Sequence, residues 1–126
     1  LHLEKSAGVK DQLKGQFVQK DSMQVLIAAV TLPNADSLKK LVYELKNEVA
    51  NACIVLAATI EDKPQVAVFI DESLLEATGL HAGNLVRELA KEIQGGGGGQ
   101  PFFATAGGKD LAGLPQVVAK AKSILL

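Results

Sequence analysis

The sequence predicts an α/β (α+β-like) fold in which a small mixed β-sheet is flanked by helices. Three runs of β-branched and small apolar residues have the length of buried strands, and three other segments place apolar residues three or four positions apart, as on one helical face. Because these strands and helices alternate irregularly, they do not fit a doubly wound parallel sheet. The chain has 126 residues, which is enough for one compact domain.

The beginning of the chain has few apolar residues. Val9, Leu13 and Phe17 are four positions apart and share one helical face, but two nearby glycines each weaken a helix by roughly 1 kcal/mol. We interpret residues 1–20 as the end of a helical tether and residues 21–126 as a globular domain. The chain starts with leucine and shows no signal-like segment, so we expect it to be a piece of a longer protein.

The first strand and the first long helix are predicted from Met23 onward. Residues Met23–Leu32 are apolar and β-branched, and a proline follows them directly. Apolar residues at helical spacing then indicate a helix over residues 38–49, with Asn34 or Asp36 as its N-cap.

A β-hairpin is predicted next. Ala52–Ile60 and Gln65–Ile70 have the composition of two strands, and the polar residues 61–64 between them indicate a short turn. The single cysteine, Cys53, lies in the first of these strands, so the chain cannot form an internal disulfide. We expect Cys53 to be a small core residue.

Two more helices are predicted in the second half of the chain. Apolar residues at helical spacing indicate a helix over residues 82–93, which we expect to begin near Thr78-Gly79 and to end at Gly95. A third apolar stripe covers residues 114–125, with Pro115 in the first turn, where a helix accepts proline. Between these two helices we expect a glycine-rich loop.

Composition and residue spacing exclude several functions. No apolar run approaches the roughly 20 residues that cross a bilayer, so we expect no membrane contact. The net charge is −1, so any nucleic-acid site must be local. Neither histidine has a partner at metal-ligand or catalytic-triad spacing, and the paired carboxylates Glu61-Asp62 and Asp71-Glu72 fit polar turns. We therefore expect no catalytic residue and no metal site in this chain.

The most informative segment lies between Gly95 and Gly113, which holds eight of the twelve glycines, five of them in succession. Ordering five glycines costs much backbone entropy, so a folded domain keeps them where φ is positive or where another backbone or a ligand approaches closely. Backbone N–H groups are then expected to form the recognition surface. The P-loop and GxGxxG patterns both fail here, which argues against nucleotide cofactors.

Aromatic residues follow the glycines directly. Phe102 and Phe103 are two of only five aromatic residues in the chain, which is an unusual composition for a flexible linker. We expect these phenylalanines to anchor the segment in the core. The alternative is that one of them stacks on a nucleobase.

Three consecutive segments resemble a known family. GGGGGQPFFATAGGKD, with LHAGNLVRELAKEI before it and LPQVVAKAKSIL after it, is similar to the C-terminal domain of alanyl-tRNA synthetases. That domain belongs to the wider DHH-associated group, which also includes DHH-type phosphoesterases and nucleases. The resemblance runs from about Met23 to the end of the chain and implies a fold of the DHH-associated domain type.

The resemblance implies a non-catalytic, tRNA-binding role. The domain would bind the outer corner, or elbow, of the tRNA for alanine, and would assist aminoacylation, editing and the formation of a homodimer. The longer protein would be a cytoplasmic alanine--tRNA ligase that uses ATP and Mg²⁺, with zinc in its editing domain. This chain itself would hold no cofactor and contact no membrane.

The glycines and the nearby basic residues are the candidate RNA contacts. Members of the family usually carry a basic residue within the glycine run and an arginine before the proline. Here these places hold Gly97 and Gln100, so a charge-assisted phosphate contact is lost. The predicted nucleic-acid-binding residues are Gly95, Gly96, Gly97, Gly98, Gly99, Gln100, Gly107, Gly108, Lys109, Arg87 and Lys91.

Two other functions stay open. The chain could be the substrate-binding subdomain of a DHH-type phosphoesterase or nuclease, although those relatives tend to have a phosphate-binding histidine after the glycines, where this chain has Gln100-Pro101. It could also be a protein-interaction or dimerisation module, whose terminal helices present apolar faces to a partner.

Overall fold

The computed structural model describes residue 13, residues 15–20 and residues 23–125. Most of the predicted helical tether therefore lies outside the described residues. Where the tether is predicted to continue, strand β1 (Val18–Lys20) instead pairs antiparallel with the strand that follows it. Three residues are too few to show the alternation by which a strand is recognised in a sequence.

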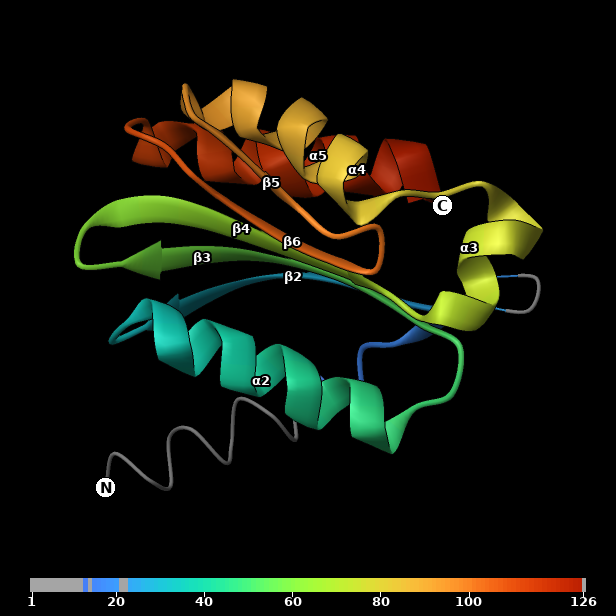
Figure 1. Ribbon diagram of the computed structural model, residues 1–126. Coiled ribbons are helices and arrows are strands. Elements are labelled where there is room, and N and C mark those ends of the chain that lie inside the picture. The colour runs from blue at the N-terminus through green and yellow to red at the C-terminus, as the bar shows by residue number, and fades with distance from the viewer. Residues whose placement is uncertain (1–12, 14, 21–22, 126) are drawn as a thin grey trace, which may run out of the picture.

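The fold has three layers (Figure 1). A sheet forms the middle layer, helix α2 (Ala35–Glu48) covers one face, and helices α4 (Ala82–Ala90) and α5 (Leu114–Leu125) cover the other. These two sides are the α2 face and the α4/α5 face. The predicted mixed sheet flanked by helices is therefore confirmed.

Besides β1, the sheet contains β2 (Met23–Leu32), β3 (Ala52–Ile60), β4 (Lys63–Ile70), β5 (Gly96–Gly99) and β6 (Phe103–Gly107). The six strands lie in the order β1-β2-β3-β4-β6-β5. β2 and β3 run parallel, and every other neighbouring pair is antiparallel. A parallel pair needs a crossover connection, which α2 supplies, whereas β3 and β4 form the predicted hairpin.

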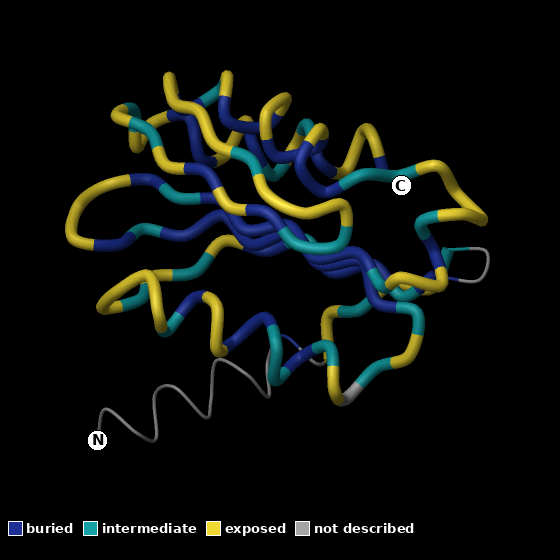
Figure 2. Tube along the Cα trace, in the orientation of Figure 1, coloured by how far each residue is buried: buried dark blue, intermediate teal, exposed yellow. Residues whose placement is uncertain are grey.

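Side-chain alternation along the strands divides the core between the two faces. Ile54 of β3 packs in the same cluster as Leu45 on the α2 face. Its neighbour Val55 packs with Val86 and Val117 on the α4/α5 face. All five side chains are fully buried, and Figure 2 shows the central strands buried along most of their length. Each such side chain contributes roughly 1.5–3 kcal/mol by leaving water.

Polar side chains begin the helices on both faces. Asn34, and not Asp36, caps α2, because its Oδ1 accepts a hydrogen bond from the N–H of Ser37 at 2.8 Å. His81 caps α4, since its Nδ1 accepts from the N–H of Asn84 at 3.2 Å. Each cap satisfies an N–H group that has no partner within the helix.

A short helix that the sequence did not predict, α3 (Glu72–Thr78), follows the β3–β4 hairpin. The paired carboxylates here do more than mark a turn, because Asp71 Oδ1 accepts a hydrogen bond from the N–H of Ser73 at 3.1 Å and begins this helix. Gly79 ends it with a φ of 73°. The predicted start of the next helix near Thr78-Gly79 is therefore wrong, since these residues end α3.

Short helical turns adjoin α4 and α5. The 3-10 helix η1 (Lys91–Ile93) follows α4, and the left-handed residue that ends it is Gln94, with a φ of 53°. The predicted end at Gly95 is therefore one residue too late. A second 3-10 helix, η2 (Leu111–Gly113), leads into α5, where Pro115 occupies the first turn as predicted.

The glycine-rich segment is a β-hairpin and not the predicted loop. All four residues of β5 are glycine, and β5 pairs with β6, which pairs in turn with β4. Gly107 of β6 lies between Gly96 on one side and Gln65 on the other. The hairpin turn is closed by a hydrogen bond from the N–H of Gln100 to the carbonyl oxygen of Phe103 at 2.8 Å.

Candidate nucleic-acid interface

The close approach of β5 to β6 explains three of the five glycines in the run, Gly95, Gly97 and Gly99. A Cβ atom at Gly99 would lie 2.7 Å from the carbonyl oxygen of Phe103, and Cβ atoms at Gly95 and Gly97 would overlap the neighbouring backbone in the same way. At Gly96 the same atom would meet open space. None of the five glycines has a positive φ. Of the two reasons expected for these glycines, close backbone approach applies at Gly95, Gly97 and Gly99, and a positive φ applies at none of the five.

Backbone N–H groups at the base of the hairpin are already hydrogen-bonded within the chain. The N–H of Gly95 donates to a carbonyl oxygen at the end of α4 at 3.0 Å. That of Gly108 donates to Pro64 at 3.1 Å, and that of Lys109 to Ile93 at 2.9 Å. The expectation that backbone N–H groups form the recognition surface is therefore wrong for these three. These three N–H groups are therefore not free to donate to a ligand, whereas the side chains nearby are candidate donors.

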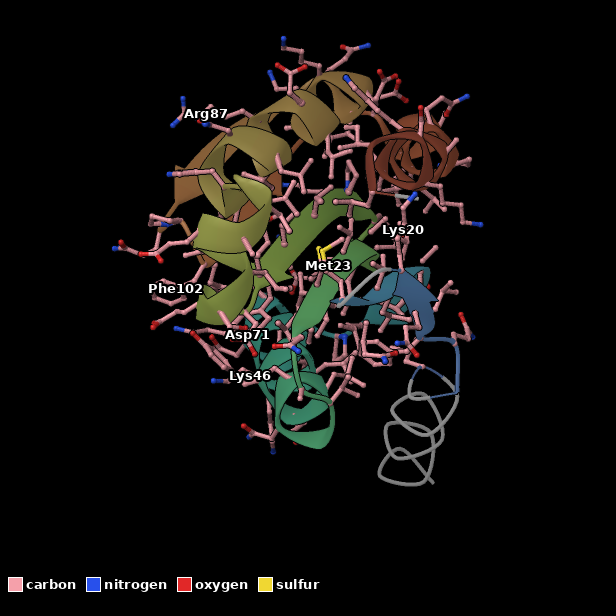
Figure 3. The ribbon with its side chains drawn as sticks, turned by 90° about the vertical axis from the view of Figure 1, so that its right-hand side faces the viewer. Lys20, Met23, Lys46, Asp71, Arg87 and Phe102 are labelled. Atoms are coloured by element: carbon pink, nitrogen blue, oxygen red, sulfur yellow. The ribbon has the colours of Figure 1, made fainter. Side chains whose placement is uncertain are left out.

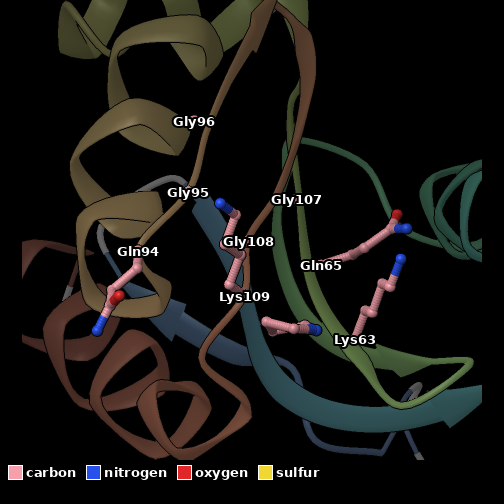
Figure 4. Close-up of a pocket in the computed structure, with 9 residues that line it drawn as sticks. Lys63, Gln65, Gln94, Gly95, Gly96, Gly107, Gly108 and Lys109 are labelled. Atoms are coloured by element: carbon pink, nitrogen blue, oxygen red, sulfur yellow. The ribbon is translucent and has the colours of Figure 1, made fainter.

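A pocket of about 350 Å³, hereafter the lysine pocket, opens beside these residues (Figure 4). It lies between the base of the glycine hairpin and the beginning of β4. Two lysines and two glutamines line it, and no carboxylate of the described residues does so. The lining residues are Lys63, Pro64, Gln65, Gln94, Gly95, Gly96, Gly107, Gly108 and Lys109.

The two lysines give the lysine pocket a positive charge. Lys63 and Lys109 are exposed, and within the described ranges neither ammonium group forms an ion pair. Each ammonium group has three N–H donors, and the glutamine amides add uncharged donors. An anionic group with several oxygen acceptors, such as the phosphate of a polynucleotide, matches this set of donors.

Five of the predicted RNA-binding residues meet at the lysine pocket. They are Gly95, Gly96, Gly107, Gly108 and Lys109. They come from two segments on either side of the hairpin turn, and the antiparallel pairing of β5 with β6 places them next to each other.

The other predicted residues lie outside the lysine pocket. The remaining glycines of the run and the exposed Gln100 lead away from it toward the hairpin turn. Arg87 of α4 adjoins β5, with its Nε 3.9 Å from where a Cβ on Gly98 would lie. Lys91 is directed to Glu88, whose carboxylate oxygen lies 3.2 Å from its Nζ. That hydrogen bond, with the attraction of the ammonium charge, holds the pKa of Glu88 below its usual value.

The basic residue expected from the resemblance does not fit at Gly97. A Cβ there would overlap the carbonyl oxygen of Thr105 and lie 2.7 Å from the Cβ of Ala106, so a long side chain has no room. Gly96 lines the lysine pocket and has no atom within 4 Å of its Cβ position. Gly96 is therefore the position in the run where a basic side chain would reach this pocket.

Besides Pro64, three lining residues were not predicted from the sequence. Lys63 and Gln65 reach the lysine pocket because Gln65 pairs with Gly107 across β4 and β6. Gln94 reaches it through its left-handed turn after η1. Lys63 and Gln65 could have been predicted only from the strand register. That register cannot be deduced before the glycine segment is recognised as a hairpin.

The phenylalanines at the other end of the hairpin pack against the core. The ring centroid of Phe103 lies 5.4 Å from that of Tyr43 on α2, and both Phe102 and Phe103 contact the apolar cluster of the α2 face. The predicted anchoring is therefore confirmed. Phe102 is only half-buried and also lines a second pocket.

The described residues hold neither a metal-binding cluster nor a cysteine thiolate. Within them, no group of three or more His, Cys, Asp and Glu side chains is placed to hold a metal ion. Cys53 is buried in β3, and burial raises the pKa of its thiol to about 12, so it stays protonated near neutral pH. None of the helices in the described part of the chain has the length and apolar character to span a membrane.

Comparison with known proteins gives a family match. The family model of the DHHA1 domain matches residues 22–126. The alanine--tRNA ligase of Cytophaga hutchinsonii is 45% identical over 97% of this chain, and that of Bacteroides fragilis is 42% identical over 93%. These matches cover 14% and 13% of the two ligases, so the chain spans about one-seventh of their length.

Two solved structures share the fold. The C-Ala domain from Aquifex aeolicus alanyl-tRNA synthetase has a TM-score of 0.73 at 22% identity, covering 86% of this chain and 96% of that chain. A DHH domain from a member of the s1p family of ribosomal proteins has a TM-score of 0.56 at 13% identity, covering 94% of this chain and 30% of that chain. At these identities the likeness shows the fold alone.

Proposed function

This chain belongs to the DHHA1 domain family, and on that premise we propose that it is the C-terminal tRNA-binding domain of an alanine--tRNA ligase. The lysine pocket is the observation that carries the proposal. Within the described residues its two lysines form no ion pair, and no carboxylate lines it. A positively charged pocket of this kind supports binding of an RNA backbone by a chain whose net charge is −1.

In this function Lys63 and Lys109 bind phosphate oxygens of the tRNA. The absence of a side chain at Gly96, which also lines the pocket, lets the RNA backbone come close. Contacts to phosphates carry no sequence information, so the pocket reads the shape of a folded RNA more than its sequence. The outer corner of a tRNA, where two loops meet, presents such a shape.

The chemistry of the parent enzyme is proposed to lie outside this chain. ATP, Mg²⁺ and zinc would be bound by its other domains, in the cytoplasm. This domain would hold the tRNA for alanine close to the aminoacylation and editing centres, which raises the effective concentration of the acceptor end at both. A homodimer would use the exposed surface of α5, where Ile124 is 45% exposed.

A second candidate function is that of a substrate-binding subdomain in a DHH-type phosphoesterase or nuclease. The fold shared with a DHH domain favours it, and the lysine pocket would then hold a substrate phosphate. Gln100-Pro101, where such relatives tend to have a histidine, argues against it.

Fluorescence anisotropy with three RNAs distinguishes these functions. The chain is titrated against an intact tRNA, an acceptor-stem hairpin and a single strand, each at two salt concentrations. We expect the intact tRNA to bind more tightly than the other two. Equal binding of the single strand would favour the nuclease-like function. If none of the three binds, both RNA functions are wrong and a protein-binding role is left.

A further inference from the structure

A second pocket, hereafter the aromatic pocket, lies at the opposite end of the hairpin from the lysine pocket. Its volume is about 230 Å³, and three of the five aromatic residues of the chain line it. Figure 3 shows Phe102, Asp71 and Lys46 one below another along one edge of the molecule. The lining residues come from α2, β4, the beginning of α3 and the hairpin turn: Tyr43, Lys46, Phe69, Asp71, Glu72 and Phe102.

Two backbone hydrogen bonds hold the turn that carries Phe102 in place. The carbonyl oxygen of Phe102 accepts a hydrogen bond from the N–H of Ile70 at 2.8 Å, and that of Pro101 accepts from the N–H of Ala82 at 2.8 Å. The turn is thereby attached both to the end of β4 and to the beginning of α4. A wall that is already ordered loses little conformational entropy when a ligand binds.

Aromatic rings and one cation form the floor and side of the aromatic pocket. The rings of Tyr43 and Phe69 meet edge to face, with centroids 6.4 Å apart. Lys46 Nζ lies 5.4 Å from the first centroid and 5.5 Å from the second, within the range of a cation–π contact. The ammonium group is thus held at the pocket, where it can donate to an oxygen of a ligand.

The charges around the aromatic pocket select against a phosphate. One ammonium group and two carboxylates line it, so its formal charge is negative. Asp71 Oδ1 accepts a hydrogen bond from the N–H of Ser73, and the hydroxyl of Ser73 lies within reach of both this oxygen and Oδ1 of Asn51. Glu72 is exposed and, within the described residues, makes no hydrogen bond or ion pair. A flat ring that has N–H donors for a carboxylate, an oxygen acceptor for Lys46 and no negative charge matches these groups.

We propose that the aromatic pocket binds an unpaired guanine base, stacked on Phe102. Guanine is the nucleobase that combines a large ring with two adjacent N–H donor groups and a carbonyl oxygen, O6, on the same edge. Glu72 accepts from the donors, and Lys46 donates to O6. The proposal rests on the RNA-binding function above and deepens it, because it adds a base-reading site to a phosphate-binding site.

Both pockets open along one strip of the sheet. Gln65 and Phe69 are four residues apart on β4 and so point to the same side, about 13 Å apart along the strand. Between them the exposed Thr105 of β6 pairs with Ala67. One RNA strand lying along this strip can therefore contact the lysine pocket with a phosphate and the aromatic pocket with a base.

Short oligonucleotides test the proposal. The RNA pentamers UUGUU, UUAUU and UUCUU are titrated into the ¹⁵N-labelled chain, and affinities are taken from amide shifts, which we expect at Phe102 and Lys46. UUGUU is expected to bind about tenfold more tightly than the other two. Glu72→Gln should remove this preference, whereas Glu76→Gln, an exposed carboxylate on the same helix, should keep it. Phe102→Leu should weaken all three pentamers while leaving the apolar contact in place.

Three outcomes would overturn the guanine site. They are equal binding of the pentamers, a guanine preference that persists in a folded Glu72→Gln protein, and binding of N-acetylarginine amide in the aromatic pocket with no binding of any pentamer. The last would point to a protein partner. In each case Lys63→Ala and Lys109→Ala can still weaken tRNA binding, so failure of the guanine site is distinguishable from failure of the RNA-binding function.

Discussion

Replacing Gly97 with alanine is expected to destabilise the protein, whereas the same change at Gly96 is not. A Cβ at Gly97 would overlap the carbonyl oxygen of Thr105 and lie 2.7 Å from the Cβ of Ala106. Neither group can rotate away, because one is backbone and the other is fixed to it. At Gly96 no atom lies within 4 Å of the new Cβ. The two substitutions thus add the same methyl group and differ only in the room that surrounds it.

The expected loss follows from two opposing contributions. Inserting a methyl group into a packed region costs about 1–3 kcal/mol. Alanine also restricts the unfolded chain, which stabilises the folded protein by about 0.4–1 kcal/mol at either position. Because the second contribution is common to both variants, Gly97→Ala is expected to be about 1–3 kcal/mol less stable than Gly96→Ala, which is itself neutral or slightly stabilised. At about 4 °C per kcal/mol, the Tm of Gly97→Ala then lies about 4–12 °C below that of Gly96→Ala.

Thermal unfolding followed by far-UV circular dichroism measures both variants against the unchanged protein. If Gly97→Ala has the same Tm as Gly96→Ala, or a higher one, close backbone approach is refuted as the reason for glycine at position 97.

Two further predictions concern Cys53 and Lys91. The pKa of the buried Cys53 thiol is raised from 9.0 to about 12, so unfolding releases its proton above about pH 9 and stability falls as the pH rises from there toward 12. At pH 10 this ionisation lowers the free energy of unfolding by about 1.4 kcal/mol. Between pH 8.5 and 10 the Tm of the unchanged protein should therefore fall more than the Tm of Cys53→Ala. Equal decreases in the two Tm values would contradict the raised pKa of Cys53. Lys91→Ala should leave tRNA affinity unchanged in anisotropy titrations, because Lys91 is paired with Glu88. A clear loss of affinity would return Lys91 to the RNA site.

The parts of the fold that carry a side-chain pattern could be predicted. Met23–Leu32 and the two strands after it are apolar and β-branched, and α2 and α5 place apolar residues at helical spacing. The strand β5 carries no such pattern, because glycine has no side chain and is intrinsically unfavourable in a strand. Its pairing with β6 and its packing against α4 decide the structure there.

The part of the lysine pocket whose residues lie close together in the sequence could be predicted. Lys109 and the glycines beside it were found because they share one segment. Lys63 lies about thirty residues before the glycine run and is brought to the site by the pairing of β4 with β6. Residues that meet through strand register leave no signal in either segment alone, which is why Lys63 was missed.

The central claim, that the lysine pocket binds tRNA phosphates, is tested most directly by the salt dependence of binding. Anisotropy titrations with intact tRNA at several salt concentrations compare the unchanged chain, the Lys63→Ala/Lys109→Ala double variant and Lys40→Ala, a lysine exposed on α2. Loss of two phosphate contacts should reduce the slope of log K against log salt by about 1.4–1.8, while Lys40→Ala leaves it unchanged. A double variant with the slope and affinity of the unchanged chain would contradict the claim.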